Sequence, residues 1–472
     1  MTTVSPDVSL PRMPLKDTLP RPAADALDHI PGNYGWPLFG NTLQVLADPI
    51  GHVQRMHAQY GPIYRNRVFG FNSVSLLGPE ANELVLFDRD RLFSSEAGWG
   101  PILDQLFPRG LMLMDFDEHR LHRKALSVAF KAGPMKSYLS ALNDGISTRV
   151  AQGQHSQQGS APFLFYPAIK QLTLDLAAAS FLGIALGPEA TTINRAFVDM
   201  VAASIGVVRQ PIPGSKMYKG VRGRAVIMEY FSREIPARRT GDGQDIFSQL
   251  CKATHEDGSL LTTQDIVDHM SFLMMAAHDT LTSSVTSLIY NLAIAPQWQQ
   301  KLREEAMDLK LGSGAGGKGS ASLPYERLGD LALVEMAFKE AMRLNPPVPG
   351  IPRRAVRGFH FGGYDIPAGT PVSINPLFTH RMPEIWPDPL RFDPMRFTEE
   401  ATRSRHKYAW VPYSGGAHMC LGLHFAYMQV KCFVYHLLTT TKVSVAPGYT
   451  PKWQMWPIPK PRDGLPVWLE RI

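Results

Sequence analysis

The sequence predicts a mainly α-helical protein with small β-sheets, an α+β domain. Three observations support this expectation: a long helical stretch that is apolar on every side, two short stretches with the pattern of β-hairpins, and no internal repeat or interdomain linker. The chain has 472 residues, of which 44% are hydrophobic, and this suffices for one large core. Charged residues make up 19%, unlike the composition of a disordered or coiled-coil chain.

The N-terminal part is expected to form an irregular arm over residues 1–30, followed by a single domain over residues 31–472. The boundary follows from the Pro- and Gly-rich stretch Ile30–Pro37, whose restricted and permissive backbone angles suit a tight surface loop. β-Branched and aromatic residues between Tyr64 and Leu77, interrupted by turn-forming residues, predict a hairpin. Helical periodicity takes over from about residue 118.

The longest predicted helix extends from Thr263 to about Ala295. Its central residues 272–277 are apolar on every side, and a helix of this kind is buried. Thr262 and Asp265, three residues apart, form a plausible capping pair at its start.

The rest of the chain adds only small elements. Leu311–Ser322 is a Gly/Ser-rich loop. Phe359–Asn375 has strand-forming residues around paired glycines, which predicts small hairpins rather than a second domain.

The composition indicates in which compartment the protein is expected to work and which partners are not expected. The three cysteines are too few for a disulfide framework, so a reducing cytoplasm is expected. The first thirty residues hold no apolar run of the length of a signal peptide or an anchor, so a soluble protein without a membrane span is expected. The net charge is +6, yet no Lys/Arg tract is long enough to indicate nucleic acid binding.

The most informative segment is Tyr413–Ala426, which contains Cys420. Three glycines, Gly415, Gly416 and Gly422, let the backbone approach the sulfur and a bound group where a Cβ would collide. The apolar run after the cysteine begins a helix, whose positive end stabilises a thiolate. A thiolate ligand of haem iron needs a deprotonated sulfur, N–H groups that point at it, and shielding from water. A buried structural cysteine is the alternative.

This segment resembles the haem-binding loop of the cytochrome P450 family, in which an aromatic residue, a glycine, a basic residue, the cysteine and a glycine recur at these spacings. The resemblance implies that Cys420 ligates the iron of haem b and that Tyr413 and Gly422 lie beside the cofactor. Tyr413 stands where the family usually has Phe, and Ser414 where Gly is common. The hydroxyl of Tyr413 needs a polar partner.

A Glu/Arg pair at helical spacing, Glu340 and Arg343, is a second landmark of the family. Residues three apart on a helix share a face and can pair. Most such pairs lie on the surface, but this one precedes Phe392–Phe397, which resembles the segment that supplies a second arginine. The resemblance implies a buried structural network of Glu340, Arg343 and Arg396 behind the cysteine loop.

The third landmark is Ala276–Thr280, in the long apolar helix. An acid and a hydroxyl side by side in a buried helix are costly unless they have partners or a task. The resemblance implies that Asp279 and Thr280 deliver protons during oxygen activation, with Ala276 beside the cofactor and a local helix distortion that makes room. Ala277 stands where Gly is usual. The alternative is a polar pair bonded to its own helix carbonyls.

Three places offer partners for the two haem propionates. His119 and Arg123, four residues apart, match the propionate-binding helix of the family. Arg353 matches the arginine that follows the Glu/Arg pair, with Arg354 as its rival because one residue of slip exchanges them. His418, two residues before the cysteine, completes the set.

The resemblance extends from Pro31 to about Trp468 and is strongest to a soluble bacterial branch related to sterol demethylases and retinoid hydroxylases. It implies a monooxygenase that acts as a monomer and uses O₂ and electrons from NAD(P)H. No flavin or iron–sulfur segment is seen after the haem domain in this sequence, so the electrons are expected to come from a separate ferredoxin and ferredoxin reductase. An acidic ferredoxin would dock by charge on a basic cluster near the sulfur, made of Arg120, His122, Arg123, Lys124 and Lys431.

The substrate is expected to be an apolar small molecule, such as a steroid, a terpenoid or a fatty-acid-like compound. The expectation follows from the apolar and aromatic candidate pocket residues, which are Trp99, Leu111, Met112, Phe272, Met275, Ala276, Ile351 and Trp456. The same residues can equally be plain core. Two alternatives stay open. One is a haem isomerase or peroxygenase that needs no external electrons, and the other is a non-catalytic haem- or ligand-binding protein.

Overall fold

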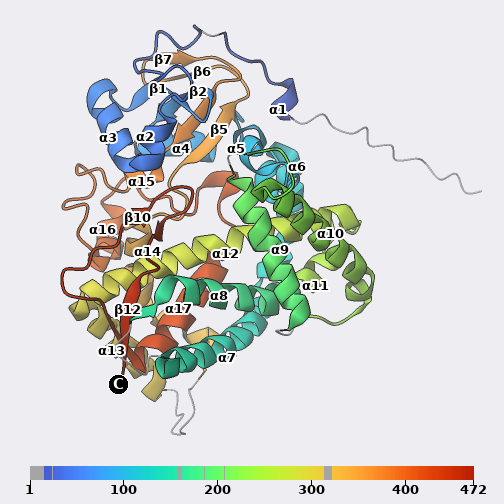
Figure 1. Ribbon diagram of the computed structural model, residues 1–472, viewed down its shortest axis with the longest axis vertical. Helices are drawn as coiled ribbons and strands as arrows, with labels where there is room; N and C mark the ends of the chain where they lie inside the picture. Colours follow the sequence, from blue (N-terminus) through green and yellow to red (C-terminus); the bar gives the residue numbers. More distant parts are fainter. Residues whose placement is uncertain (1–14, 24, 157–161, 185–186, 207, 313–321) are drawn as a thin grey trace, which may run out of the picture.

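The structure is a computed structural model that describes residues 15–23, 25–156, 162–184, 187–206, 208–312 and 322–472. A large helical part lies below a smaller β-rich lobe, as Figure 1 shows. The predicted mainly α-helical fold with small β-sheets is confirmed. Most of the predicted Gly/Ser-rich loop, residues 313–321, lies outside the described residues.

The helices account for most of the ordered chain. They are α1 (Leu15–Thr18), α2 (Thr42–Ala47), α3 (Pro49–Tyr60), α4 (Pro79–Phe87), α5 (Ser95–Leu103), η1 (Leu111–Leu113), α6 (Phe116–Leu126), η2 (Ser127–Phe130), α7 (Ala132–Ser156), α8 (Phe165–Ala177), η3 (Ala178–Leu182), α9 (Pro188–Ser204), α10 (Lys216–Thr240), α11 (Ile246–Cys251), α12 (Thr263–Ile294), α13 (Pro296–Gly312), η4 (Tyr325–Asp330), α14 (Ala332–Leu344), α15 (Pro376–Thr379), η5 (Pro394–Phe397), α16 (Glu399–Arg403), η6 (Gly416–His418) and α17 (Leu423–Leu438).

The strands form small sheets. They are β1 (Ile63–Val68), β2 (Phe71–Leu76), β3 (Phe93–Ser94), β4 (Phe163–Leu164), β5 (Ile351–Ala355), β6 (Phe359–Phe361), β7 (Tyr364–Ile366), β8 (Pro371–Ile374), β9 (Thr441–Ser444), β10 (Trp453–Gln454), β11 (Lys460–Pro461) and β12 (Pro466–Arg471). The largest sheet among the described residues has five strands in the order β1-β2-β8-β5-β3, in which only β2 and β8 run parallel. Both predicted hairpins are present, as β1–β2 and β6–β7.

Helix α12 crosses the centre of the helical part in Figure 1. It begins as predicted, because the Thr262 hydroxyl accepts a hydrogen bond from the Asp265 N–H at 3.1 Å. Hydroxyl groups along its second half donate back to the carbonyl four residues earlier, and these groups belong to Thr280, Thr282, Ser284 and Thr286. These bonds satisfy polar groups within the helix itself, so it can stay buried.

Two hydrophobic cores correspond to the two parts of the fold. The larger core joins α7, α8, α12, α14 and α17, and the smaller one lies under the five-stranded sheet. The end of the predicted arm contributes to the smaller core, since Leu27 and Ile30 are buried there. Arg65 fastens this segment by donating from Nη1 to the carbonyls of Asp28 and Ile30 at 2.6 and 2.7 Å.

The prediction that helical structure begins near residue 118 is wrong, because α2, α3, α4 and α5 precede it. These helices are short, between 6 and 12 residues, and prolines start two of them and interrupt a third. Each of these helices is therefore too short for its hydrophobic periodicity to be recognised in the sequence. Among the described residues, no helix combines the length and the apolar character needed to cross a bilayer.

Candidate active site

The cysteine loop, Tyr413–Gly422, lies between α16 and α17 and contains η6. The Cys420 N–H donates to the Tyr413 carbonyl at 2.9 Å, which closes the loop on itself. Ser414 and Gly416 both have left-handed backbones, with φ of 62° and 58°. A Cβ on Gly416 would lie 2.1 Å from the carbonyl oxygen of Leu86, so this glycine lets the loop approach the end of α4. The expectation that Gly416 makes room at the sulfur is therefore corrected, since the close neighbour is backbone of α4.

The Cys420 thiol faces space inside the protein. The residue is exposed, yet burial raises the pKa of its thiol above the ordinary value, and a sulfur on the outer surface would not show that shift. A hydrogen bond from the Gly422 N–H and the charge of Arg123 both oppose the rise in this pKa. A Cβ on Gly422 would meet nothing within 4 Å, so the chain leaves open space beside the sulfur.

Two histidines with tilted rings in contact lie near Cys420. The rings of His119, on α6, and His418, in the cysteine loop, have centroids 4.0 Å apart. Burial lowers the pKa of His119 to about 4, and burial lowers the pKa of His418 well below its ordinary value. Arg353 and Arg123 lower both pKa values further, so both imidazoles are neutral at pH 7 and sit in a positive field. The buried Nε2 of His119 has no hydrogen-bond partner among the described residues.

Arg353 is a buried cation on β5. It is 4% exposed, and its Nη1 donates to the carbonyl of the neighbouring Pro352 at 2.9 Å. Burial lowers the pKa of Arg353 to about 10, although Asp115 and Asp88 oppose the shift. Arg354 points to the other face of the strand and donates to the carbonyls of Gly369 and Pro20.

Asp115 is the acid nearest to Arg353, His119 and His418, and its carboxylate already accepts hydrogen bonds from other residues. It is 5% exposed and accepts hydrogen bonds from the Ser94 hydroxyl at 2.5 Å and the Ser95 N–H at 2.7 Å. Its Oδ1 lies 3.9 Å from Nε2 of His418. Hydrogen bonds already use most of the lone pairs of the Asp115 carboxylate. Arg353 and the unpaired His119 nitrogen can therefore bind a further anionic group.

The centre of α12 is less buried than the stretches on either side of it. Met275, Ala276, Ala277, Asp279 and Thr280 are half-buried, whereas residues 266–274 and 281–289 are buried. The Thr280 hydroxyl donates to the Ala276 carbonyl at 2.6 Å. The expected local distortion is absent, since the described α12 is a continuous α-helix here. Ala277 stands where a glycine would loosen the helix, and alanine favours a regular turn.

Asp279 lies on the side of α12 that faces α8. Its Oδ1 is 3.2 Å from Nζ of Lys170 and 3.5 Å from Nε2 of His278. Burial lowers the pKa of His278 to about 4, and its Nδ1 lies 3.1 Å from the Thr173 hydroxyl. Asp279 is thus held by α8, while Thr280 is held by its own helix.

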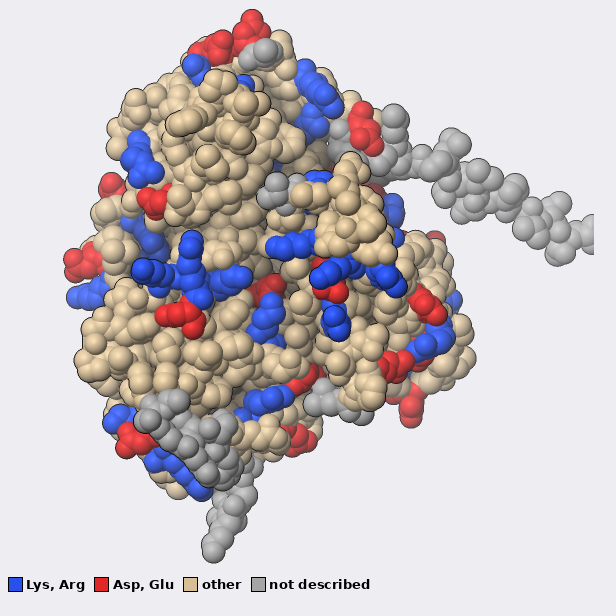
Figure 2. All heavy atoms as spheres, in the orientation of Figure 1, with Lys and Arg blue, Asp and Glu red and all other residues tan. Residues whose placement is uncertain are grey.

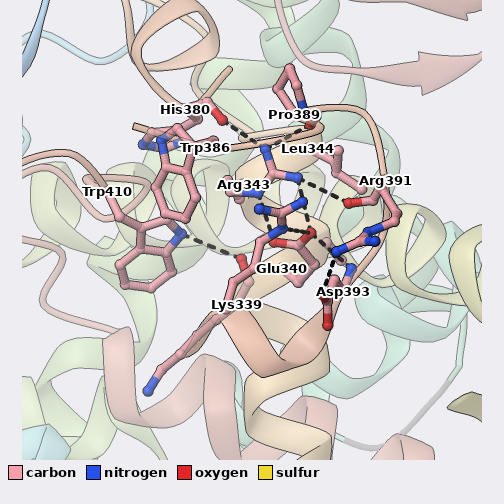
Figure 3. A network of polar contacts seen from close by, with 12 residues as sticks. Lys339, Glu340, Arg343, Leu344, His380, Trp386, Pro389, Arg391, Asp393 and Trp410 are labelled. Carbon is pink, nitrogen blue, oxygen red and sulfur yellow. Dashed lines mark hydrogen bonds and ion pairs between the residues drawn. The ribbon is translucent and has the colours of Figure 1, made fainter. Parts of the chain in front are cut away.

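The predicted structural network of Glu340, Arg343 and Arg396 is present, and Figure 3 shows its Glu340–Arg343 pair. Glu340 and Arg343 are both 0% exposed, and Nε and Nη2 of Arg343 donate to the carboxylate at 2.6 and 2.9 Å. Nη1 of Arg343 donates to the carbonyls of His380 and Pro389. Arg396 Nε lies 3.4 Å from Glu340 Oε1, and the Asp393 N–H donates to the same oxygen at 3.0 Å.

The predicted basic docking cluster is only partly on the surface. His122 is buried, with Nδ1 2.9 Å from Nε2 of His269 on α12, and Lys431 is buried in a contact with Glu335. Both expectations were wrong because residue type alone does not reveal burial. Arg120 and Lys124 are exposed, and both contact Glu256.

The candidate pocket residues divide into two groups. Leu111, Phe272 and Ile351 are fully buried core residues, while Trp99, Met112, Met275 and Ala276 are partly buried against the main core. Trp456 is half-buried and stacks on Phe69 of the β1–β2 hairpin, with ring centroids 4.8 Å apart.

Sequence reasoning missed Asp115, Lys170 and Thr173 as members of the site. Asp115 had a detectable signal, because an acid at the N-cap position directly precedes the helix that carries His119. The other two lie on α8, more than one hundred residues from Asp279, and no local pattern marks them.

Comparisons with known proteins agree with this geometry. The family model described as "Cytochrome P450" matches residues 30–460. Cytochrome P450 136 of Mycobacterium tuberculosis is 35% identical over 97% of this chain and 91% of its own length. Taxane 10-beta-hydroxylase of Taxus cuspidata is 28% identical over 86% of this chain and 82% of its own length.

A solved structure, retinoic acid-bound cyanobacterial CYP120A1, superimposes with a TM-score of 0.82 at 28% identity. The match covers 94% of this chain and 99% of that one. The chain therefore belongs to the cytochrome P450 family of haem-thiolate monooxygenases.

Proposed function

We propose that this enzyme inserts one oxygen atom from O₂ into a C–H or C=C bond of an apolar small molecule, with electrons from NAD(P)H that arrive through a separate ferredoxin and ferredoxin reductase. The observation that supports the site best is the set of buried cations and imidazoles beside Cys420. Arg353 and His119 are buried with unmet capacity for an anion, and Gly422 faces open space. A flat cofactor with two carboxylates and an iron that takes a thiolate suits these residues.

In this proposal Cys420 ligates the iron of haem b, and Arg123, Arg353, His119 and His418 bind its propionates. Tyr413, Gly422 and Ala276 lie against the cofactor. Haem bound there supplies the iron at which dioxygen is activated. Arg353 takes the propionate role rather than Arg354, because Arg353 is the one near His119 and His418 while Arg354 is bonded on the opposite face.

Asp279 and Thr280 hold and move protons in this proposal. Lys170 and His278 keep the Asp279 carboxylate in place at the α8 side of the helix. The Thr280 hydroxyl is half-buried and needs only a side-chain rotation to leave the Ala276 carbonyl and donate elsewhere. An Asp and a hydroxyl poised in this way favour oxygen activation over an isomerase or peroxygenase reaction.

An apolar substrate is supported by the character of the surrounding core and by two named relatives. Aromatic and aliphatic residues dominate near α12 and α5, a lining typical of sites for apolar ligands. One relative is a taxane hydroxylase, and one solved neighbour holds retinoic acid. We place the substrate among terpenoids, steroids and fatty-acid-like compounds, and the enzyme in the cytoplasm as a monomer.

The test is spectroscopic. The reduced, carbon monoxide-bound protein is expected to show the Soret band of a thiolate-ligated haem, and Cys420→Ala is expected to lose it while Cys432→Ala keeps it. The same band in Cys420→Ala would overturn the assignment of the ligand. A spectral-shift screen of terpenoids, steroids and fatty acids then reports which class displaces the iron-bound water.

The redox route has its own test. Turnover that needs NADH together with added ferredoxin and reductase supports the monooxygenase, whereas turnover without external electrons supports the isomerase or peroxygenase. Reduction by an acidic ferredoxin is expected to slow as salt increases, because Arg120 and Lys124 are exposed cations. A rate indifferent to ionic strength contradicts docking by charge.

A further inference from the structure

The two exposed cations of α6 share a carboxylate of this chain. Glu256, in the turn between α11 and α12, has its Oε1 2.8 Å from Nζ of Lys124 and 3.6 Å from Nη1 of Arg120. The three side chains are between 42% and 67% exposed. The hydrogen bond from Lys124 lowers the pKa of Glu256 below its ordinary value, so the carboxylate is charged at pH 7. One internal acid therefore neutralises part of the positive charge on this face.

Ion pairs are common on the surface of this protein, so pairing alone does not distinguish the contact. Figure 2 shows acidic and basic side chains next to each other at several places on one face of the molecule. The Glu256 contact differs in its position, because it lies on the helix that also carries His119 and Arg123. In the proposed function these two residues bind the haem propionates. An electron donor that binds Arg120 and Lys124 is therefore separated from the cofactor by a single helix.

The turn that carries Glu256 is hydrogen-bonded within itself. The His255 N–H donates to the Ser259 carbonyl at 2.8 Å, and the Gly258 N–H donates to the His255 carbonyl at 3.1 Å. Oδ1 of Asp257 accepts from the N–H and from the hydroxyl of Ser259, at 2.9 and 2.6 Å. These bonds do not involve α6, so Glu256 can release its two cations while the turn stays folded.

Release of the Glu256 carboxylate needs only a rotation of its side chain. The ring of His255 contacts the ring of the buried His122 on α6, with centroids 5.4 Å apart, and this contact keeps the turn in place. An exposed ion pair changes an equilibrium constant by about fivefold at most. A carboxylate from another protein can therefore take the place of Glu256, because it replaces one exposed ion pair with another and leaves Glu256 in water.

We propose that Glu256 occupies the position of a partner's carboxylate, and that docking of an acidic ferredoxin exchanges one acid for the other at Lys124 and Arg120. This inference rests on the proposed redox route. Asp117 lies 3.8 Å from Arg120 and keeps that side chain paired during the exchange, so Lys124 is the cation that changes partner. The internal acid selects for partners that present a carboxylate at this position, since a weakly charged protein does not displace it.

The experiment measures the dissociation constant of an acidic plant-type ferredoxin on the haem-loaded enzyme by isothermal titration calorimetry, at low and at physiological ionic strength. Glu256→Gln is expected to bind the ferredoxin about three- to fivefold more tightly than the wild type at low ionic strength, because Lys124 no longer has to leave a charged partner. The gain is expected to shrink at physiological ionic strength, where salt screens both ion pairs.

Glu470→Gln is the matched control. Glu470 is an exposed carboxylate 3.4 Å from Nζ of Lys442, on β12, which lies far from α6 in Figure 1. This variant loses the same charge and is expected to keep the wild-type dissociation constant. In a Lys124→Gln background, Glu256→Gln is expected to gain less than it does in the wild type, because its closest cation is missing.

The exchange is overturned if Glu256→Gln binds with the affinity of the wild type, or if Glu470→Gln gains as much as Glu256→Gln. In both cases, wild-type binding that weakens with salt would still support the proposed docking by charge. Wild-type binding that is independent of ionic strength would overturn the docking by charge and the exchange together. These titrations do not depend on turnover, so the proposed oxidation is tested separately.

Discussion

Replacing Arg343 with Met is expected to destabilise the protein by about 3–5 kcal/mol, the cost of removing one partner from a buried ion pair. Arg343 gives two hydrogen bonds to Glu340 and two more, at 2.8 Å, to the carbonyls of His380 and Pro389. All four acceptors lose that donor in the variant. A bond to a charged group is worth about 1.5–3 kcal/mol, so the two bonds to Glu340 alone can account for the lower limit.

Glu340 limits how large the loss becomes. Burial raises the pKa of Glu340 above its ordinary value even with Arg343 present, so without the arginine this carboxyl takes up a proton instead of remaining charged. The double variant Glu340→Gln/Arg343→Met is therefore expected to be more stable than Arg343→Met alone, by about 0.5–3 kcal/mol. A neutral amide leaves no carboxylate charge in the core, and its oxygen can still accept from Arg396 and from the Asp393 N–H.

The assay is urea unfolding followed by far-UV circular dichroism. Arg403→Met is the matched control, because Arg403 pairs with Glu399 at i,i+4 spacing with both side chains 77% exposed. The control is expected to change the free energy of unfolding by no more than about 0.5 kcal/mol. Equal losses in Arg343→Met and Arg403→Met, with equal dependence on urea, would refute the role of burial.

Three further predictions follow from single side chains. Burial lowers the pKa of His436 to about 4 in the folded protein, whereas the pKa in the unfolded chain is about 6.5. As pH falls below about 6.5, protons therefore bind the unfolded chain first. The stability that is present at pH 7 is lost toward pH 4. Unfolding measured between pH 7.5 and 4.5 is expected to depend less on pH in His436→Gln, and an unchanged slope would contradict this. Gly416→Ala is expected to lower the melting temperature more than Gly61→Ala. Both glycines have positive φ, but only the Cβ added at Gly416 would collide with backbone atoms. Equal losses would show that the positive φ alone determines the loss of stability. Arg353→Met is expected to weaken haem binding about tenfold or more while the apoprotein keeps its stability, and Arg354→Met should leave haem affinity unchanged; the reverse order in a haem titration would assign the propionate to Arg354.

Sequence patterns predicted the elements whose signal is long or sharply punctuated. The bounds of helix α12 were predicted to within one residue. A long apolar stretch that follows a capping threonine strongly favours a buried helix over other structures. The two hairpins turn at Phe69–Gly70 and Gly362–Gly363, where every residue has positive φ. The early helices were missed because helices of 6 to 12 residues depend on tertiary packing more than on their own period.

Sequence patterns were likewise limited to local features in predicting the site. Motif spacing located Cys420, Glu340 and Arg343 along the chain, since local geometry fixes those positions. It could not reveal that Lys170 of α8 pairs with Asp279, or that Asp115 lies beside His418, because such contacts join distant segments. It also placed His122 and Lys431 on the surface, whereas tertiary packing buries both.

The back-bonded hydroxyls of α12 differ in what they can do. Thr286 is 0% exposed, and turning its hydroxyl away from the Thr282 carbonyl would leave a buried donor with no acceptor among the described residues. Thr280 has the same bond but stands in the half-buried stretch, so its proton can change acceptor by rotation about one torsion angle. Of these two threonines, the half-buried Thr280 can rotate its hydroxyl, whereas burial holds the hydroxyl of Thr286 on its carbonyl.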